Sequence, residues 1–217
     1  MGKTGIKMVG KQRERQLEDL RHEIESCRRC RDNPVGVQLP HEPNPVVRLS
    51  SSARICIAGQ APGIRVHESS LPFNDPSGDR LRQWMGIDRD LFYDENRIAI
   101  VPMGFCFPGW DKKGGDLPPR KECRELWHDQ LFELMPQIEL VLVIGQYAQR
   151  YHMKELRKKT LTETVRNAVE IFENSQKPQL LPLPHPSWRN SGWLKRNPWF
   201  EDQVLPLLKQ EVRRLTC

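Results

Sequence analysis

The chain has 217 residues, 37% of them hydrophobic, which is enough for one well-cored domain but short for two, so we expect a single domain over residues 1–217. No apolar run approaches the ~20 residues of a membrane span, and Met1–Val9 lacks an apolar stretch of signal-peptide length, so we expect a cytoplasmic protein. Lys and Arg outnumber Asp and Glu by 34 to 28, a net charge of +6 that suits a polyanionic partner without identifying one.

The N-terminal part is predicted to hold one helix and an irregular arm. Residues 1–12 are expected to be flexible, and apolar residues at spacings of three and four predict a helix over 13–26. Four prolines then predict an extended, irregular crossing over 33–52. Residues 13–52 therefore form an N-terminal helix and arm ahead of the main fold.

Four short apolar runs are predicted as strands, with helices between them. The strands are expected at 53–58, 97–101, 140–144 and 180–183, the last weakened by Pro182. The helices are expected at 77–85, 120–135, 146–151, 161–172 and 199–215. This alternation predicts an α/β fold with three layers, in which helices cover both faces of a central, mainly parallel, four-stranded sheet.

Two loops that leave strand ends carry the candidate chemistry, because ligands bind beyond the carboxyl ends of parallel strands. The first is Gly59-Gln60-Ala61-Pro62-Gly63, whose glycines allow close approach of a ligand; an ordinary strand-to-helix turn is the competing interpretation. The second contains His185 between two prolines, which restrict its backbone and fix the direction of the imidazole. Isolated histidines are usually structural, but this setting favours a functional one.

Together the two loops resemble the signature motifs of the uracil-DNA glycosylase superfamily. The likeness covers roughly residues 27–210, and Pro72-Phe73 followed by Gly78-x-x-Leu81 is similar to the segment whose aromatic ring stacks on a flipped base. By this resemblance Phe73 stacks on the base, His185 binds its carbonyl and stabilises negative charge, and Ser187 holds a phosphate. The other base-binding candidates are Gly59, Ala61, Pro62 and Gly63. DNA is the implied partner, approached by a monomer.

The segment after Ser187 mixes large apolar side chains with cations, as in loops that fill a vacated base stack and bind phosphates. Arg189 and Lys195 are the predicted DNA contacts. The alternative for Trp193 and Leu194 is that they begin the packing of the last helix.

Cysteines at 27 and 30 form a Cys-x-x-Cys pair, and those at 106 and 123 are separated by sixteen residues. Alone, either pair is compatible with zinc, an iron–sulfur cluster or no metal. The arrangement resembles the iron–sulfur branch of the superfamily, called family 4, which implies a structural [4Fe–4S] cluster on Cys27, Cys30, Cys106 and Cys123; zinc in the same site is the alternative. Cys56 is expected to be a buried apolar residue in a strand.

Several residues depart from that branch. Gln60 stands where its catalytic glutamate is expected, Ala61 is not the aspartate of another branch, and Pro102 replaces a base-reading asparagine. Asp75 is a candidate replacement carboxylate that orients water, with helix capping as its alternative role. His67 is a candidate polar lining residue, against a capping or solvent-facing role.

These observations predict a DNA glycosylase that removes uracil or a related deaminated base, with His185, Gln60 and Asp75 as the catalytic candidates. Gln60 and Pro102 also favour two alternatives. One is a catalytically weak member that binds nucleic acid, and the other is a glycosylase for hypoxanthine or xanthine.

Overall fold

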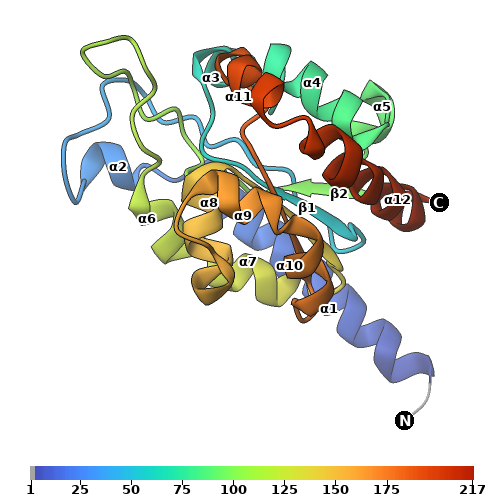
Figure 1. Ribbon diagram of the computed structural model, residues 1–217. Helices are drawn as coiled ribbons and strands as arrows, with labels where there is room; N and C mark the ends of the chain where they lie inside the picture. Colours follow the sequence, from blue (N-terminus) through green and yellow to red (C-terminus); the bar gives the residue numbers. More distant parts are fainter. Residues whose placement is uncertain (1–2) are drawn as a thin grey trace.

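The computed structural model describes the backbone of residues 3–217, with side chains described from Gly10 onward. In this part of the chain, four strands form one sheet in the order β2-β1-β3-β4, and all neighbouring pairs are parallel (Figure 1). The strands are β1 (Ile55–Ala58), β2 (Ile98–Ile100), β3 (Leu140–Ile144) and β4 (Gln179–Leu183). The predicted α/β class with a central sheet is therefore confirmed.

Both faces of the sheet are buried, as its continuous apolar strands require. Ile55 and Ile57 of β1 belong to one hydrophobic core, whereas Cys56 and Ala58 belong to the other. The same alternation holds along β3. Cys56 has no exposed surface, as predicted, and burial raises the pKa of its thiol to about 12.

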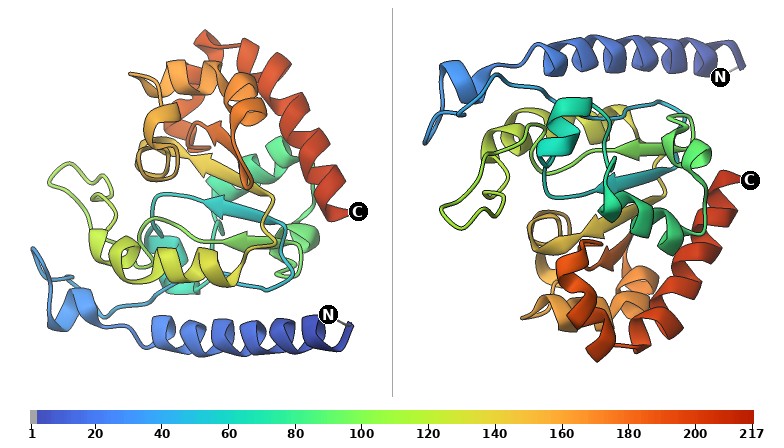
Figure 2. Two further views of the ribbon diagram at one scale, coloured as in Figure 1. Left: turned by 90° about the horizontal axis from the view of Figure 1, so that it is seen from below. Right: turned by 90° about the horizontal axis from the view of Figure 1, so that it is seen from above.

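Helices form the two outer layers (Figure 2). One core includes side chains of α1 (Lys3–Glu25), α7 (Asp129–Leu134) and α8 (Gly145–His152). The other includes side chains of α4 (Pro76–Met85), α5 (Arg89–Tyr93), α9 (Leu161–Arg166), α10 (Ala168–Asn174) and α12 (Leu205–Thr216). The shorter α2 (Arg29–Asp32), α3 (Ile64–Ser69), α6 (Lys121–Cys123) and α11 (Ser191–Arg196) accompany the loops. No helix within residues 3–217 is long and apolar enough to cross a membrane.

Several predicted helix boundaries were wrong. Residues 3–12 continue α1 instead of preceding it, while residues 1 and 2 lie outside the described residues. The helix predicted over 161–172 divides at Asn167, which ends α9 and precedes α10. The segments predicted at 120–135 and 199–215 each contain a π-helical turn, η1 (Arg124–His128) and η4 (Phe200–Val204). Pro182 lies within β4, which it can because β4 is an edge strand.

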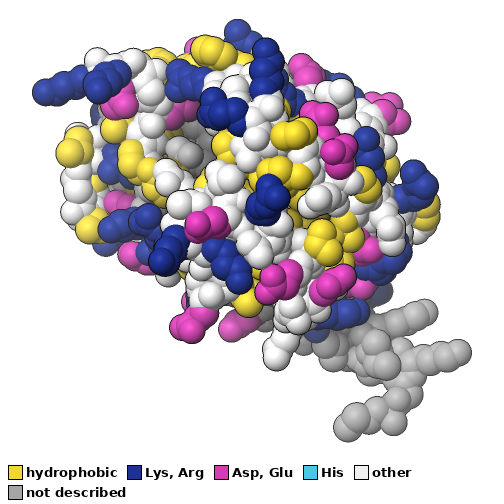
Figure 3. All heavy atoms as spheres, viewed as in Figure 1, with side chains coloured by type: hydrophobic (Ala, Val, Ile, Leu, Met, Phe, Trp, Pro, Cys, Tyr) yellow, Lys and Arg dark blue, Asp and Glu magenta, His cyan; other side chains and the backbone are white. Residues whose placement is uncertain are grey.

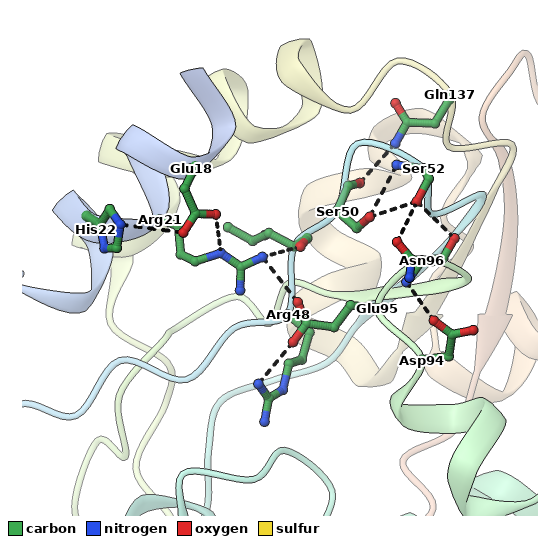
Figure 4. Close-up of polar contacts among 11 residues, drawn as sticks. Glu18, Arg21, His22, Arg48, Ser50, Ser52, Asp94, Glu95, Asn96 and Gln137 are labelled. Atoms are coloured by element: carbon green, nitrogen blue, oxygen red, sulfur yellow. Dashed lines mark hydrogen bonds and ion pairs between the residues drawn. The ribbon is translucent and has the colours of Figure 1, made fainter. Parts of the chain in front are cut away.

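A polar network fixes α1 to the segments around β1 and β2 (Figure 4). Arg21 of α1 donates to the Leu49 carbonyl and forms an ion pair with Glu95 at 3.1 Å. Glu95 also pairs with Arg48 at 3.0 Å. These partly buried contacts hold the end of α1, and with it the start of the arm that carries Cys27, at a defined place on the fold.

The buried His128 and the half-buried His152 predict a loss of stability in acid. Burial lowers the pKa of His128 to about 4 and that of His152 to about 3. The unfolded chain, with histidines near their ordinary ~6.5, therefore binds protons that the folded chain does not, and stability should fall as the pH decreases below ~6.5. His152 Nε2 has no hydrogen-bond partner among the described residues, so His152→Phe removes one titrating ring without breaking a bond.

His152→Phe should therefore flatten the dependence of the unfolding free energy on pH by up to ~1.4 kcal/mol per pH unit between about pH 4.5 and 6. Urea unfolding across this range measures the slope. The matched control is His22→Phe on α1, where the ring is 68% exposed, and it should keep the wild-type slope. Equal slopes for His152→Phe and the wild type would contradict the assignment of His152 as a histidine that stays neutral in the folded chain.

Candidate functional site

The first loop leaves β1 and is bound to the segment that follows β2. The carbonyls of Gly59 and Gln60 accept hydrogen bonds of 3.0 Å from the backbone N–H groups of Met103 and Gly104. Gly63 then precedes α3 with extended backbone, so the loop runs directly into a short helix. The loop is therefore held in one conformation by the neighbouring strand end, as expected where two parallel strands finish side by side.

Phe73 lies against this loop and has a strained backbone conformation. Its φ of 55° is unusual for a bulky residue, and such outliers persist where the surrounding structure enforces them. A Cβ atom on Gly78 would lie only 1.8 Å from the Phe73 carbonyl oxygen, so glycine is required there. The ring packs edge-on against Phe92 at 5.9 Å, and its Cζ lies 3.5 Å from where a Cβ of Gly59 would stand. The structure thus brings Phe73 to the first loop.

His185 follows β4 with its ring orientation fixed by its own loop. Its Nδ1 accepts a hydrogen bond from the Ser187 N–H at 3.2 Å, and its carbonyl accepts one from Asn190 at 2.8 Å. Since Nδ1 is the acceptor, the neutral ring carries its proton on Nε2. Burial lowers the pKa of His185, and the nearby charge of Asp75 only partly opposes this. The site therefore holds a neutral imidazole with an Nε2–H donor.

Asp75 and Ser187, which sequence reasoning placed in the site, both also have local structural roles. Asp75 Oδ1 accepts from the Gly78 N–H at 2.9 Å and caps α4, so the predicted capping role exists. The same carboxylate is close enough to His185 to influence its pKa. Ser187 Oγ accepts from the Arg189 N–H at 3.1 Å. That bond uses an oxygen lone pair, and the hydroxyl hydrogen can still be donated to a phosphate.

Cationic side chains surround the His185 loop. Arg80 of α4 donates to the Ser187 carbonyl at 2.9 Å and so connects α4 to this loop. Arg189 and Lys195 are exposed, whereas Trp193 and Leu194 pack against the core, which confirms the structural alternative for these two. Trp188 is 70% exposed. Figure 3 shows lysine and arginine side chains along the upper edge of the molecule, beside a hollow.

His67 lies on the Phe107 side of the first loop. Its ring centroid is 4.3 Å from that of His41 and 6.2 Å from that of Phe107. Burial and the adjacent His41 lower its pKa. Its Nδ1 is buried and has no hydrogen-bond partner among the described residues. The ring therefore belongs to an aromatic cluster beside the loop.

Asp116 is a residue of this region that sequence reasoning missed. One of its carboxylate oxygens, Oδ2, lies 3.7 Å from where a Cβ of Gly63 would stand. Asp116 is exposed, but neighbouring protein atoms displace part of its hydration and, with the nearby Asp111 and Asp75, raise its pKa, while Arg189 lowers it. The segment 111–116 is polar and contains none of the site residues predicted from the sequence. Its Gly114-Gly115 pair signals a tight turn, and a turn there returns Asp116 toward the strand ends.

Four cysteines line a single small pocket. They come from the link between α1 and α2, from α2, from the segment after β2 and from α6, and they are Cys27, Cys30, Cys106 and Cys123. A thiol hydrogen bond between Cys30 and Cys123 lowers the pKa of Cys30 and raises that of Cys123. Among the described residues, no group of three or more His, Cys, Asp or Glu side chains has the geometry to hold a metal ion.

Comparison with known proteins connects this region with a family. Residues 47–209 match the model of the uracil DNA glycosylase superfamily, a range that includes the first loop, Phe73 and His185. The chain is also similar to the solution NMR structure of a protein from Methanosarcina acetivorans described as a candidate uracil DNA glycosylase. The identity is 17%, the match covers 76% of this chain and 94% of that chain, and the TM-score is 0.44.

Proposed function

This chain belongs to the uracil DNA glycosylase superfamily, and on that premise we propose that it is a DNA glycosylase that removes uracil or a related deaminated base. One observation carries the proposal: His185 is a half-buried neutral imidazole that offers Nε2–H at the carboxyl edge of the sheet. A preorganised donor of this kind stabilises the negative charge that develops on a departing base.

The neighbouring residues supply the rest of the reaction. A base that has been turned out of the strand would stack on Phe73, whose ring is held against Gly59. The charge of Asp75, and a water that its carboxylate orients, would favour the cationic sugar left by N-glycosidic cleavage. Gln60 can bind the base or the water through its amide but cannot remove a proton as a carboxylate does. Most of the acceleration therefore falls to His185.

DNA is held by groups around the His185 loop. The Ser187 hydroxyl and the exposed Arg189 and Lys195 would bind phosphates, because cations that displace counterions from phosphates give affinity without sequence preference. The exposed Trp188 next to Ser187 can occupy the gap left by the displaced base. We expect the protein to act as a monomer.

A second lesion class is favoured by one residue. Pro102, in place of a base-reading amide, has neither a side-chain donor nor a backbone N–H to pair with uracil. Hypoxanthine or xanthine is therefore the alternative substrate base. A member that binds damaged nucleic acid without turnover is the non-enzymatic alternative.

The test is incubation with single-stranded and duplex oligonucleotides that carry uracil, hypoxanthine or xanthine, followed by alkali to cleave abasic sites. The proposal expects strand cleavage at the position of at least one of these bases, and an undamaged strand serves as control. Binding without cleavage of any oligonucleotide would establish the non-enzymatic alternative instead.

We further propose that the four-cysteine pocket holds a [4Fe–4S] cluster, as the resemblance to the iron–sulfur branch implies. The chemistry of the donor set supports the proposal, because four thiols from separate segments line one pocket and thiolates are the ligands of such clusters; binding would have to draw the four sulfurs closer together. When bound, the cluster would act as a structural cross-link between the N-terminal arm and the segment after β2. The Phe105 N–H, 3.3 Å from Cys123 Sγ, would donate to one ligand sulfur.

Protein purified without oxygen should contain about four iron and four sulfide per chain and absorb in the visible range. Cys123→Ser should lose most of this iron and much stability, because one of four ligands is removed. The exposed Cys217→Ser is the matched control and should keep the wild-type content. One zinc per chain would instead establish the zinc alternative, and metal-free, stable protein would contradict both.

A further inference from the structure

The hairpin that follows Cys106 holds Asp116 in a fixed position. Trp110 and Asp116 face each other in an antiparallel bridge at its base. Asp111 closes the turn by accepting from the N–H groups of Lys113 at 2.7 Å and Gly115 at 2.9 Å. The Leu117 N–H donates to the Gly109 carbonyl at 2.9 Å just below the bridge. The backbone on both sides of Asp116 is therefore tied down.

The Asp116 carboxylate lies at the end of the first loop. Its Oδ2 atom is 3.7 Å from the position that a Cβ of Gly63 would take. The carboxylate therefore borders the open space next to the Gly63 backbone. Asp116 remains accessible to solvent, and it is within electrostatic reach of Asp75 and of Arg189. It thus lies beside the end of the first loop and within electrostatic reach of the segment that follows His185.

The segment after β2 lacks a polar group at residue 102 that could form hydrogen bonds with a base. Pro102 has no N–H, and its carbonyl already accepts a hydrogen bond of 3.0 Å from the buried His128 Nε2. Pro102 is buried as well. This segment therefore offers a base no polar group at residue 102, which leaves room for a residue besides Gln60 to supply hydrogen bonds that distinguish one base from another.

We propose that Asp116 is that specificity-determining residue, an inference that rests on the proposed glycosylase function. An ionised carboxylate only accepts hydrogen bonds, so it favours a base whose facing edge carries an N–H group. It disfavours a base that presents a carbonyl oxygen there, because two acceptors then face each other without a proton between them. Discrimination of this kind exceeds what an apolar wall can give.

Binding measurements test this without depending on catalysis. Labelled single-stranded oligonucleotides with one uracil, hypoxanthine or xanthine are titrated with His185→Ala and with His185→Ala/Asp116→Asn. Asparagine keeps the side-chain volume but replaces an acceptor by a donor. The ratio between the affinities for the best and the worst base should change at least ~10-fold. The control pair uses Asp111→Asn, which perturbs the same hairpin and should leave the ratio unchanged.

Three outcomes overturn the inference: an unchanged ratio, an equal loss of affinity for all three oligonucleotides, or the same change of ratio in the Asp111 variant. An equal loss would mean that Asp116 acts on the strand in general and not on the base. Failure of the wild-type protein to excise any base would contradict the proposed glycosylase function, and this result is independent of the affinity ratios. The affinity ratios decide the role of Asp116 in either case.

Discussion

His185→Ala should reduce the rate of base excision by roughly 10²- to 10³-fold, the usual effect of removing one preorganised transition-state donor. The loss should appear in kcat with little change in KM, because the hydrogen bond from Nε2 strengthens only as charge develops on the leaving base. Single-turnover kinetics on the preferred oligonucleotide measure it. His185→Asn keeps an N–H donor and should lose less activity than His185→Ala.

The neutral state of His185 adds a pH signature. Burial lowers its pKa, so the ring should remain neutral, and the site active, as the pH falls through the ordinary histidine value of ~6.5. A group that had to be protonated would instead lose activity as the pH rises through that value. His22→Ala, on the exposed face of α1, is the matched control. A wild-type rate in His185→Ala would remove this residue from the mechanism.

Gly78→Ala should cost about 3 kcal/mol or more of folding stability and most of the activity. The new Cβ would lie 1.8 Å from the Phe73 carbonyl oxygen and 2.7 Å from its carbonyl carbon, and backbone atoms cannot move aside without displacing Phe73 or the start of α4. Both displacements would affect the ring that faces Gly59 and the Asp75 cap. Urea unfolding and the excision assay measure the two effects.

The control for this variant is Gly10→Ala in α1, where a Cβ meets no atom within 4 Å. Alanine favours the helix over glycine, so this change should stabilise by up to ~1 kcal/mol. The two substitutions are chemically identical and differ only in the space available. Unaltered stability and excision in Gly78→Ala would contradict the claim that the absence of a Cβ at Gly78 makes room for the Phe73 backbone.

The strands could be predicted from the sequence because each is a short run of apolar residues buried on both faces. The 140–144 run, for example, coincides with β3. Helix boundaries were harder to predict from the sequence. The division at Asn167 and the π-helical turns depend on tertiary packing and have no signature in the local sequence. The short α3 and α5 fell in segments where no helix was predicted.

The candidate site was predictable where its residues are adjacent in sequence. The glycine loop after β1 and the proline-flanked His185 stand out because their backbones are unusual. The strained backbone of Phe73 and the position of Asp116 follow from contacts between segments distant in sequence, such as the approach of Asp116 to Gly63. Spacing along the sequence does not reveal contacts of this kind, so sequence reasoning proposed Asp75 as the carboxylate of the site and did not identify Asp116.

The most direct test of the central claim is to detect the free base released from uracil-, hypoxanthine- and xanthine-containing DNA by mass spectrometry. The wild-type protein should release at least one of these bases together with an equal amount of abasic sites, and His185→Ala should release it at least ~10²-fold more slowly. No release of any base by the folded wild-type protein, or equal release by both proteins, would contradict a glycosylase built around His185.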